Sequence, residues 1–339
     1  MAARPKPSIR DVARAAGVSA QTVSRVANGH PSVRPATRER VEQAMTETGY
    51  VPNRAARVLR TGSSRTIGVM SHRFERTGEN LTLGAVVEAA EQHSFSVTLT
   101  TLPDASHTDW ARTRQRLELQ GLDGLVVLRH EAATEDSLLL PDGLPVAVSD
   151  SRLVGAHPAV VTDQTEGTRA MVQHLLGLGH RTVHHVGGPE DSEPAQQRAE
   201  AWRRTLEEAG APVPEVAQGD WTAASGLEAG RRLAADPSAT AVFCANDEMA
   251  FGVMRAFTEA GLRIPQDRSV AGFDDVGLAA YAPTPLSTIR QDFRRIGQEL
   301  VALVMRQLDG ARPEELERVV VPTELVLRQS TGTPETGGR

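Results

Sequence analysis

The chain has 339 residues, of which 40% are hydrophobic and 24% charged, as in a globular protein and unlike a fibrous or disordered one. This length exceeds that of one hydrophobic core, so we expect two or three folding units. The single cysteine, Cys244, excludes an internal disulfide and a cysteine-based zinc site. No apolar segment approaches the roughly 18 residues that span a membrane, and no signal-peptide pattern is present. We therefore expect a cytoplasmic protein without a membrane partner.

Charge is distributed unevenly along the chain. The whole chain has a net charge of -6, but residues 1–62 hold eleven Lys and Arg against four Asp and Glu. Their net charge is therefore +7, and that of the remainder is -13. A basic head on an acidic body is typical of a DNA-binding module joined to a part that does not bind DNA.

Two short helices with a tight turn between them are predicted near the N-terminus. Ser8 stands three residues before Asp11, the spacing of a capping box, so a helix should begin at Ile9. Gly17 allows the positive φ where this helix ends, and Ser19 can cap a second helix. The outward face of that helix carries Gln and Arg, which suit adenine and guanine edges in the major groove. A pair of surface helices in another all-α domain is the alternative.

A third helix and a linker follow. Pro35 and Val41 indicate a helix that Gly49 ends, which completes a helix-turn-helix domain over residues 1–49. Residues 50–64 predict a hinge helix and linker, too short to be stable alone and expected to fold only on a partner. In a dimer, paired leucines of this segment could enter a DNA base step. An ordinary basic interdomain linker is the alternative.

From residue 65 onward, short β-branched runs alternate with helical segments such as Phe293–Leu308. This alternation predicts an α/β core of doubly wound parallel sheets, which at this length should fold as two lobes with a cleft between them. The strand-like Arg318–Leu327 should carry the chain back between the lobes. The expected boundaries are residues 65–330 for the core, about 65–162 plus 293–321 for the N-lobe, about 163–290 plus 322–330 for the C-lobe, and 331–339 for a disordered tail.

Polar side chains stand where several predicted strands end. Asp150, Asn246 and Asp274 each follow an apolar run, and open α/β sheets bind ligands outside the carboxyl ends of their strands. Trp221 could stack on the apolar face of a sugar ring. A helix cap is the alternative for each carboxylate or amide, and a core aromatic is the alternative for the indole. The predicted effector site, suited to a neutral polyol, consists of Asp150, Arg198, Trp221, Asn246, Asp274 and Gln291.

Catalytic signatures are absent from the sequence. It has no GxxxxGK[ST], no GxSxG and no GxGxxG after a predicted strand. The segment HEAAT, which begins at His130, lacks the second histidine of a zinc protease. We therefore predict no catalytic residue, no metal site and no cofactor. A sugar-acting enzyme or a sugar-binding protein is the weaker alternative.

Several segments match one known family in the same order, over residues 8 to about 328. They are DVARAAGVSAQTVSRVANG, TRERVEQAMTETGYVPNRAARVL, EGTRAMVQHLLGLGHR, GDWTAASG, ANDEMAFGVMRAFTEAGLRIP, and GFDD with QDFRRIGQ. Through these segments the chain resembles the LacI/GalR family of transcription regulators. The resemblance implies that the two lobes form a periplasmic-binding-protein-like core. It also implies a homodimer that binds a palindromic, double-stranded operator DNA and a sugar effector.

The resemblance also implies residue roles. The second helix would read the major groove of each half-site, and the hinge helices would place paired leucines in a central base step. The DNA-binding residues so implied are Ser19, Ala20, Gln21, Thr22, Ser24, Arg25, Asn28, Asn53, Arg54, Ala56 and Leu59. The six predicted effector residues match positions that hold the sugar in galactoside-responsive members.

The implied function is repression of a carbohydrate utilisation operon, with release by a galactoside or related β-glycoside. A regulator that needs its ligand to bind DNA, as purine-responsive members do, is the alternative. Three features depart from the family's pattern. Ala20 stands where family members can carry an aromatic residue, Ser71–Asn80 is more charged than its apolar counterpart, and no C-terminal leucine heptad is present, which favours a dimer over a tetramer.

Overall fold

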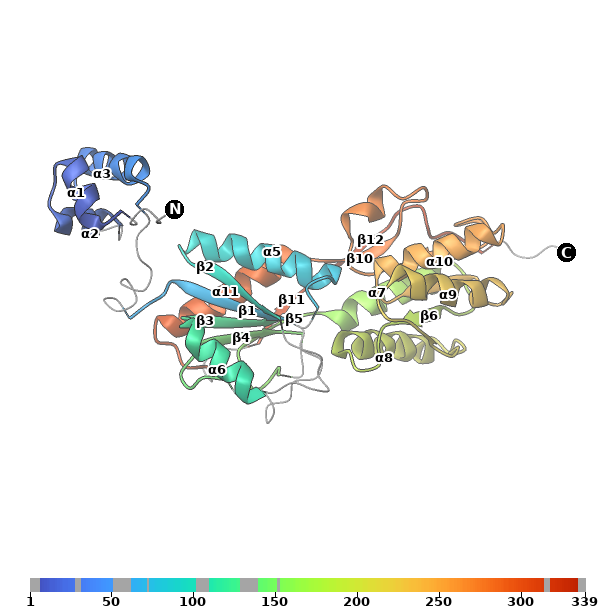
Figure 1. Ribbon diagram of the computed structural model, residues 1–339. Helices are drawn as coiled ribbons and strands as arrows, with labels where there is room; N and C mark the ends of the chain where they lie inside the picture. The colour runs from blue at the N-terminus through green and yellow to red at the C-terminus, as the bar shows by residue number, and fades with distance from the viewer. Residues whose placement is uncertain are drawn as a thin grey trace. The chain divides into compact units, whose positions relative to one another are not determined.

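The structure, a computed structural model, describes residues 7–27, 32–50, 62–71, 73–101, 110–128, 140–150, 153–313 and 318–334. The chain divides into two compact units, residues 1–64 and residues 65–339, and Figure 1 labels most of their helices and strands. In the described ranges, no helix is both long enough and apolar enough to cross a membrane.

Three helices form the described part of the first unit: α1 (Ile9–Ala16), α2 (Ala20–Ala27) and α3 (Pro35–Thr48). The three predicted helices are thereby confirmed. Val12, Val23 and Val41, one from each helix, are fully buried in a shared small core. A unit of this size is held together by the packing of these few apolar faces, because short helices are marginal in isolation.

The ends of these helices follow the predicted caps. The amide and the hydroxyl of Ser8 donate to a carboxylate oxygen of Asp11 at 2.9 and 2.6 Å. The amide of Thr22 donates to the hydroxyl oxygen of Ser19 at 3.1 Å, so Ser19 caps α2. Gly17 ends α1 with a φ of 63°, a conformation that a residue without Cβ adopts without strain.

The N-lobe of the second unit is built on a parallel sheet that has six strands among the described residues, in the order β11-β5-β4-β3-β1-β2. The strands are β1 (Thr66–Ser71), β2 (Ser96–Thr101), β3 (Gly124–Leu128), β4 (Val146–Ser149), β5 (Ala159–Thr162) and β11 (Val319–Val321). The helices are α5 (Thr77–Gln92), α6 (Trp110–Gln120) and α11 (Phe293–Leu308).

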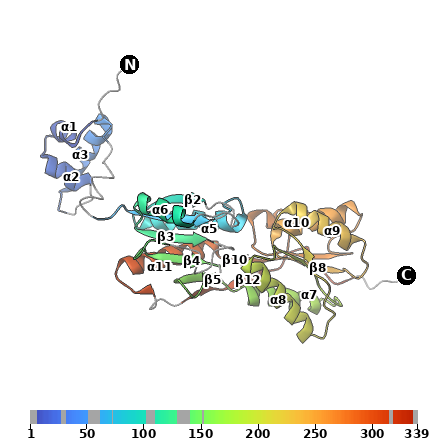
Figure 2. The same cartoon turned by 60° about the horizontal axis from the view of Figure 1, so that its bottom comes forward.

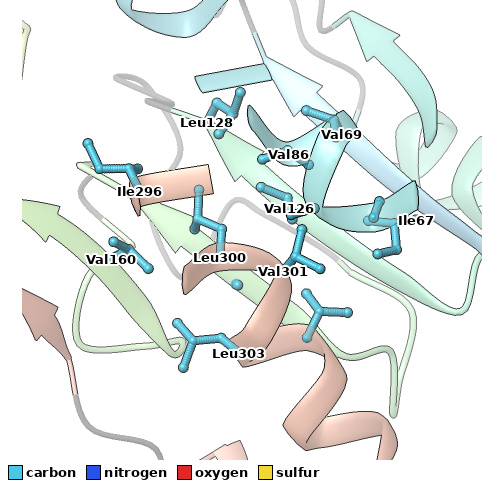
Figure 3. Close-up of a cluster of buried hydrophobic side chains, with 14 of the residues drawn as sticks. Ile67, Val69, Val86, Val126, Leu128, Val160, Ile296, Leu300, Val301 and Leu303 are labelled. Atoms are coloured by element: carbon cyan, nitrogen blue, oxygen red, sulfur yellow. The ribbon is translucent and has the colours of Figure 1, made fainter. Parts of the chain in front are cut away.

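Both faces of this sheet are covered, and β3 shows how. Val126 and Leu128 lie in the cluster that α5 and α11 complete, shown in Figure 3. Leu125 and Val127 lie in the opposite cluster with Leu117 of α6. Successive side chains of a strand point to opposite faces, so a strand covered on both sides is apolar throughout. The apolar runs in the sequence therefore indicate strands that are covered on both faces of the sheet.

The C-lobe repeats this arrangement on a parallel sheet with four strands in the described residues, ordered β7-β6-β8-β9. Figure 2 shows α9 and α10 on one side of β8 and α7 and α8 on the other. The strands are β6 (His184–Gly187), β7 (Ala217–Gln218), β8 (Ala241–Cys244) and β9 (Ser269–Ala271). The helices are α7 (Gln164–Gly177), α8 (Glu193–Glu208), α9 (Ala223–Ala234), α10 (Asp247–Glu259) and the short 3-10 helix η2 (Gly277–Ala280).

The chain passes between the lobes after β5, after β10 (Thr288–Gln291) and after β11. The single strand predicted for Arg318–Leu327 is wrong, because β11 belongs to the N-lobe sheet and β12 (Thr323–Val326) pairs with β10 in antiparallel fashion. Pro322 separates the two strands. Proline has no amide hydrogen to donate to a ladder, which explains the break at the crossing.

The predicted disorder of the tail is wrong for its described part, residues 331–334. Nε2 of His180 lies 3.0 Å from the carbonyl oxygen of Gly332, and the amide of Gly332 donates to the hydroxyl of Ser269 at 3.0 Å. The hydroxyl of Thr331 lies 3.1 Å from Nε2 of His174. The polar composition of the tail suggests disorder. The residues that bind the tail are distant in sequence, so the tail's own composition does not reveal them. Residues 335–339 lie outside the described ranges.

Two glycines set the close approach of α9 and α10. A Cβ on Gly252 would lie 2.1 Å from the carbonyl oxygen of Ala223, and one on Gly226 would lie 2.2 Å from that of Met249. We expect Gly252→Ala to lower the free energy of unfolding by roughly 1–3 kcal/mol, because overpacking forces the helices apart. Chemical denaturation measures this change. The matched control is Gly84→Ala on α5, where a Cβ meets no atom within 4 Å; an equal loss in both variants would contradict the packing argument.

Candidate functional site

A cavity of about 280 Å³ lies between the lobes, at the carboxyl ends of the C-lobe strands. Ligands of open α/β sheets bind at this edge. The C-lobe lines the cavity with Ser192, Arg198, Asp220, Trp221, Thr222, Asn246, Glu248 and Asp274. The N-lobe lines it with Arg73, Glu75, Arg76, Thr77, Gly78 and Glu79.

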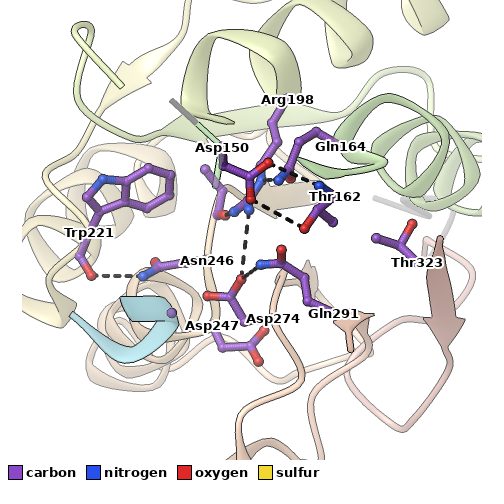
Figure 4. Close-up of polar contacts among 12 residues, drawn as sticks. Asp150, Thr162, Gln164, Arg198, Trp221, Asn246, Asp247, Asp274, Gln291 and Thr323 are labelled. Atoms are coloured by element: carbon purple, nitrogen blue, oxygen red, sulfur yellow. Dashed lines mark hydrogen bonds and ion pairs between the residues drawn. The ribbon is translucent and has the colours of Figure 1, made fainter. Parts of the chain in front are cut away.

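The structure brings five of the six predicted effector residues together. Arg198, Trp221, Asn246 and Asp274 line the cavity directly. Gln291 stands behind Asp274, to whose carboxylate its Nε2 donates at 2.5 Å (Figure 4). These five residues come from five separate segments of the chain, so the fold and not the sequence spacing assembles them.

Asp150, the sixth predicted residue, lines a neighbouring cavity instead. Its carboxylate accepts the amide hydrogen of Thr162 at 3.0 Å and its hydroxyl at 3.4 Å. Gln164, which also lines that second cavity, connects it to the first because its Oε1 accepts from Nε of Arg198 at 2.8 Å. Asp150 is thus adjacent to the main cavity but not part of its wall.

Arg198 is the most deeply buried charged side chain of the cavity, with 1% exposure. Its guanidinium lies 3.7 Å from the ring centre of Phe273 and 5.6 Å from that of Trp221, distances at which a cation is attracted to an aromatic face. It also donates to the carbonyl oxygen of Ala245, and its Nη2 lies 3.8 Å from the carboxylate of Asp274. These contacts hold the guanidinium in one orientation.

The first residues of several helices converge on the cavity. Arg76, Ser192, Thr222 and Asn246 are the N-cap residues of α5, α8, α9 and α10, and all four line it. Helix N-termini present amide hydrogens and partial positive charge. The cavity is therefore suited to a ligand rich in oxygen atoms.

Backbone strain marks the same residues. Trp221 has a φ of 75° and Asp274 a φ of 119°, and Asp150 in the neighbouring cavity has a φ of 35°. Non-glycine residues adopt such values at a cost, and they persist where the surrounding structure holds them for a purpose, often at binding sites. Three of the six described non-glycine residues with positive φ therefore lie in the walls of these two cavities.

A second, fully buried carboxyl lies near Asp274. Asp247 is fully buried, and burial, with a further contribution from nearby Asp274, raises the pKa of its carboxyl well above the usual range. It accepts from the hydroxyl of Thr288 at 2.5 Å and from the amide of Val276 at 2.8 Å. Asp247 thereby ties the start of α10 to β10 and to the loop before η2.

Sequence reasoning named no residue of the N-lobe wall. The resemblance placed Ser71–Asn80, more charged than its apolar counterpart, at the far end of the sugar, and this segment supplies all six N-lobe lining residues. The hydroxyl of Thr77 donates to the carboxylate of Glu248, which joins the two lobes across the cavity. Ser192 and Thr222 were detectable as helix caps next to strand ends. Among the described residues, no group of His, Cys, Asp and Glu could hold a metal ion.

The first unit exposes the predicted recognition face of α2. Ser19, Gln21 and Arg25 are exposed, whereas Ala20 packs partly against the core of that unit. Thr22 and Ser24 are half-buried. The remaining predicted DNA contacts, Asn28, Asn53, Arg54, Ala56 and Leu59, lie outside the described residues.

A helix-turn-helix unit followed by a two-lobed core with an oxygen-suited cavity defines a DNA-binding regulator with a ligand-binding domain. The family comparisons agree with this class. Residues 8–53 match the model of bacterial regulatory proteins of the lacI family, and residues 172–331 match that of the periplasmic binding protein-like domain. The chain belongs to the LacI family of transcription regulators.

Two characterised relatives cover nearly the whole chain. The lactose operon repressor of Escherichia coli (strain K12) is 33% identical over 97% of this chain and 92% of its own length. The HTH-type transcriptional regulator CelR of Thermobifida fusca is 34% identical over 97% of this chain and 100% of its own length. Both are regulators, which confirms that the chain is not an enzyme and removes the enzymatic alternative.

Solved structures show the same fold. The lac repressor dimer bound to operator and the anti-inducer ONPF matches with a TM-score of 0.82 at 32% identity, over 97% of this chain and 100% of that one. The CelR-cellobiose complex matches with a TM-score of 0.70 at 30% identity, over 96% of this chain and 99% of that one. The predicted fold class is therefore confirmed.

His185 in β6 predicts how stability depends on pH. Its ring stacks between Trp202 and Phe243, each 5.2 Å away between ring centres, and burial lowers its pKa from 6.5 to about 4. Between pH 6.5 and 4 the unfolded chain therefore binds a proton that the folded chain excludes, so stability falls as pH falls. This group alone should cost roughly 3 kcal/mol of unfolding free energy across that window. Denaturation at several pH values measures the loss, and His185→Phe should weaken the dependence; an unchanged slope in the variant would show that other groups cause it.

Proposed function

We propose that this regulator is a repressor of a carbohydrate utilisation operon, and that a galactoside or related β-glycoside releases it from its operator. The chain would act as a homodimer on a palindromic site in the cytoplasm. The observation that carries the proposal is the pairing of one indole with a set of hydrogen-bonding groups in the same cavity. Trp221 offers an apolar face, while Asn246, Asp274 and Arg198 offer acceptors and donors.

This combination is suited to a sugar ring. A pyranose has an apolar face of C–H groups and a rim of hydroxyls, each of which is both donor and acceptor. An aromatic ring takes the face, and short polar side chains take the rim and set orientation. The comparisons support the same ligand class, since the CelR structure contains cellobiose.

The first unit would supply DNA recognition. Gln21 and Arg25 are exposed on α2, and such side chains can pair in bidentate fashion with adenine and guanine in the major groove. Ser19, Ala20, Thr22 and Ser24 would add contacts on the same helix. The hinge residues Asn53, Arg54, Ala56 and Leu59, with Asn28, are proposed contacts by resemblance. The solved lac repressor dimer is bound to operator, which supports this arrangement.

The sugar can act on DNA binding only through a difference in affinity between two arrangements of the protein. The lobes are joined by three crossings and by the contact from Thr77 to Glu248. A ligand between the lobes contacts both and therefore favours one relative orientation. We propose that this orientation is incompatible with paired hinge helices on DNA.

The test combines operator selection with sugar titration. The full-length protein first selects its site from a library of random DNA duplexes. Binding to the selected duplex should fall by about 1,000-fold or more between 50 and 200 mM salt, because phosphate neutralisation releases counterions. A panel of mono- and disaccharides is then titrated by calorimetry and by operator-release assays. Tighter DNA binding on addition of sugar would overturn the direction of the response, and the absence of any sugar response would overturn the ligand class.

Replacing Trp221 tests the stacking role. Trp221→Ala should weaken sugar binding by about 30-fold, which corresponds to about 2 kcal/mol, because the ring loses its stacking surface. Operator affinity without sugar should stay unchanged. Trp221→Phe is the matched control, since it keeps an aromatic face and should lose less. If Trp221→Ala responds to the same sugar concentration as the wild type, the indole does not hold the ligand.

A further inference from the structure

The two walls of the cavity differ in chemistry. The C-lobe wall contains Trp221, which is the only large apolar side chain among the described residues that line the cavity. The N-lobe wall, made by the loop before α5 and its first turn, contains no apolar side chain larger than glycine. Ligand sites for drug-like molecules are mostly apolar with few polar groups. This wall is the opposite, and it requires a ligand that is polar on the side facing it.

The best-defined feature of the N-lobe wall is an ion pair. Nη1 of Arg76 lies 3.9 Å from Oε1 of Glu79, and the side chains are 17% and 2% exposed. Removing the remaining water from such a pair with an apolar group costs free energy unless the group replaces the lost hydrogen bonds. A ring that carries hydroxyls replaces them, whereas a phenyl or alkyl group does not.

The hydrogen bond that joins the two lobes, from Thr77 to Glu248, also involves a carboxylate that a ligand hydroxyl can bind. The hydroxyl of Thr77 donates to Oε1 of Glu248, whose other oxygen accepts from Nδ2 of Asn246 at 2.9 Å. A ligand hydroxyl entering between the lobes can take the place of the threonine hydroxyl on Glu248. The exchange of one O–H donor for another leaves the carboxylate satisfied.

The side-chain charge of the cavity favours an uncharged ligand over an anionic one. Five carboxylates and three guanidinium groups line the cavity, a net side-chain charge of -2. One of the carboxylates, Asp220, accepts from the hydroxyl of Thr222 at 2.6 Å, and this hydrogen bond holds the pKa of Asp220 below its usual range. A phosphate or carboxylate on the ligand would be repelled by the surplus.

We infer that the N-lobe wall is a second subsite for an uncharged, hydroxyl-bearing sugar ring, with Arg76, Glu79 and Glu248 as the specificity-determining residues. The effector is then a neutral disaccharide whose first ring lies on Trp221, and not an aryl or alkyl glycoside or a phosphorylated sugar. This inference rests on the proposed function and narrows it. A site built to hydrogen-bond a ligand rejects analogues that lack the matching hydroxyls, because its own polar groups are then left unpaired.

Matched ligand pairs test the subsite by calorimetry on the full-length protein. Cellobiose is compared with phenyl β-D-glucopyranoside, and lactose with phenyl β-D-galactopyranoside; each pair shares the first ring and differs in the second. Within the pair that binds, the disaccharide should be at least about tenfold tighter. The 6-phosphate of the disaccharide that binds should have a lower affinity than the unphosphorylated disaccharide. A phenyl glycoside or a phosphate that binds as tightly or more tightly overturns the inference.

Variants of the wall supply the second arm. Arg76→Met and Glu79→Gln should each weaken binding of the disaccharide by about tenfold, because a hydrogen bond to a charged group is lost. Neither variant should weaken binding of the phenyl glycoside, which makes no hydrogen bond to this wall through its phenyl ring. Glu88→Gln on the same helix is the control, since its carboxylate pairs with Arg294 outside the cavity at 2.8 Å. Thermal unfolding verifies that each variant is folded, and an undiminished affinity for the phenyl glycoside verifies that the rest of the cavity is intact.

The failures of the two proposals differ. If the sugar panel finds a monosaccharide as the tightest effector, or if the wall variants weaken both members of a pair equally, the second subsite is wrong and the sugar-responsive repressor stands. If no sugar in the panel binds or changes operator affinity, the proposed function fails and the subsite fails with it.

Discussion

The arrangement of the cleft depends on the burial of one guanidinium group. A charge removed from water is costly unless its neighbours replace the lost hydration, and Arg198 is almost wholly buried. Gln164 at the first crossing, the carbonyl oxygen of Ala245 after β8, the ring of Phe273 and the carboxylate of Asp274 share that task. These groups come from distant segments of the chain. Their contacts with the one guanidinium therefore fix the position of the C-lobe strand ends relative to the first crossing.

From this cation a chain of charged groups leads to the other two crossings. Asp274 continues into Asp275, whose carboxylate accepts from Nε of Arg290 at 2.7 Å and from Nη2 of Arg328 at 2.6 Å. Arg290 belongs to β10, and Arg328 follows β12, the strand that pairs with β10. A ligand that shifts Asp274 therefore acts on a residue adjacent to the ion pairs of the ribbon that joins the lobes. These contacts form a contiguous series of charged groups, the kind of network that can carry coupling between two sites.

The sequence predicts those parts of the molecule that local chemistry decides. The caps at Ser8 and Ser19, the doubly buried strands and α11 follow from spacing and composition, and strand ends locate the C-lobe wall. It does not predict what tertiary proximity decides. The N-lobe wall, with Arg76, is a loop and a first helical turn, and nothing in the spacing of its charged residues shows which of them face the cavity. Asp150 obeys the strand-end rule but turns toward Thr162 in a neighbouring cavity.

Asn246 shows why capping and ligand binding, which the sequence presents as alternatives, are compatible. Its Oδ1 accepts from the amide of Met249, and its Nδ2 donates to the carbonyl oxygen of Trp221 and to Glu248, each at 2.9 Å. Both amide hydrogens are therefore used, and one acceptor position on Oδ1 remains. The capping hydrogen bond fixes the side-chain amide, so the remaining lone pair of Oδ1 is already oriented before a ligand binds. A ligand hydroxyl that donates to it gains a hydrogen bond without the entropy cost of ordering a side chain.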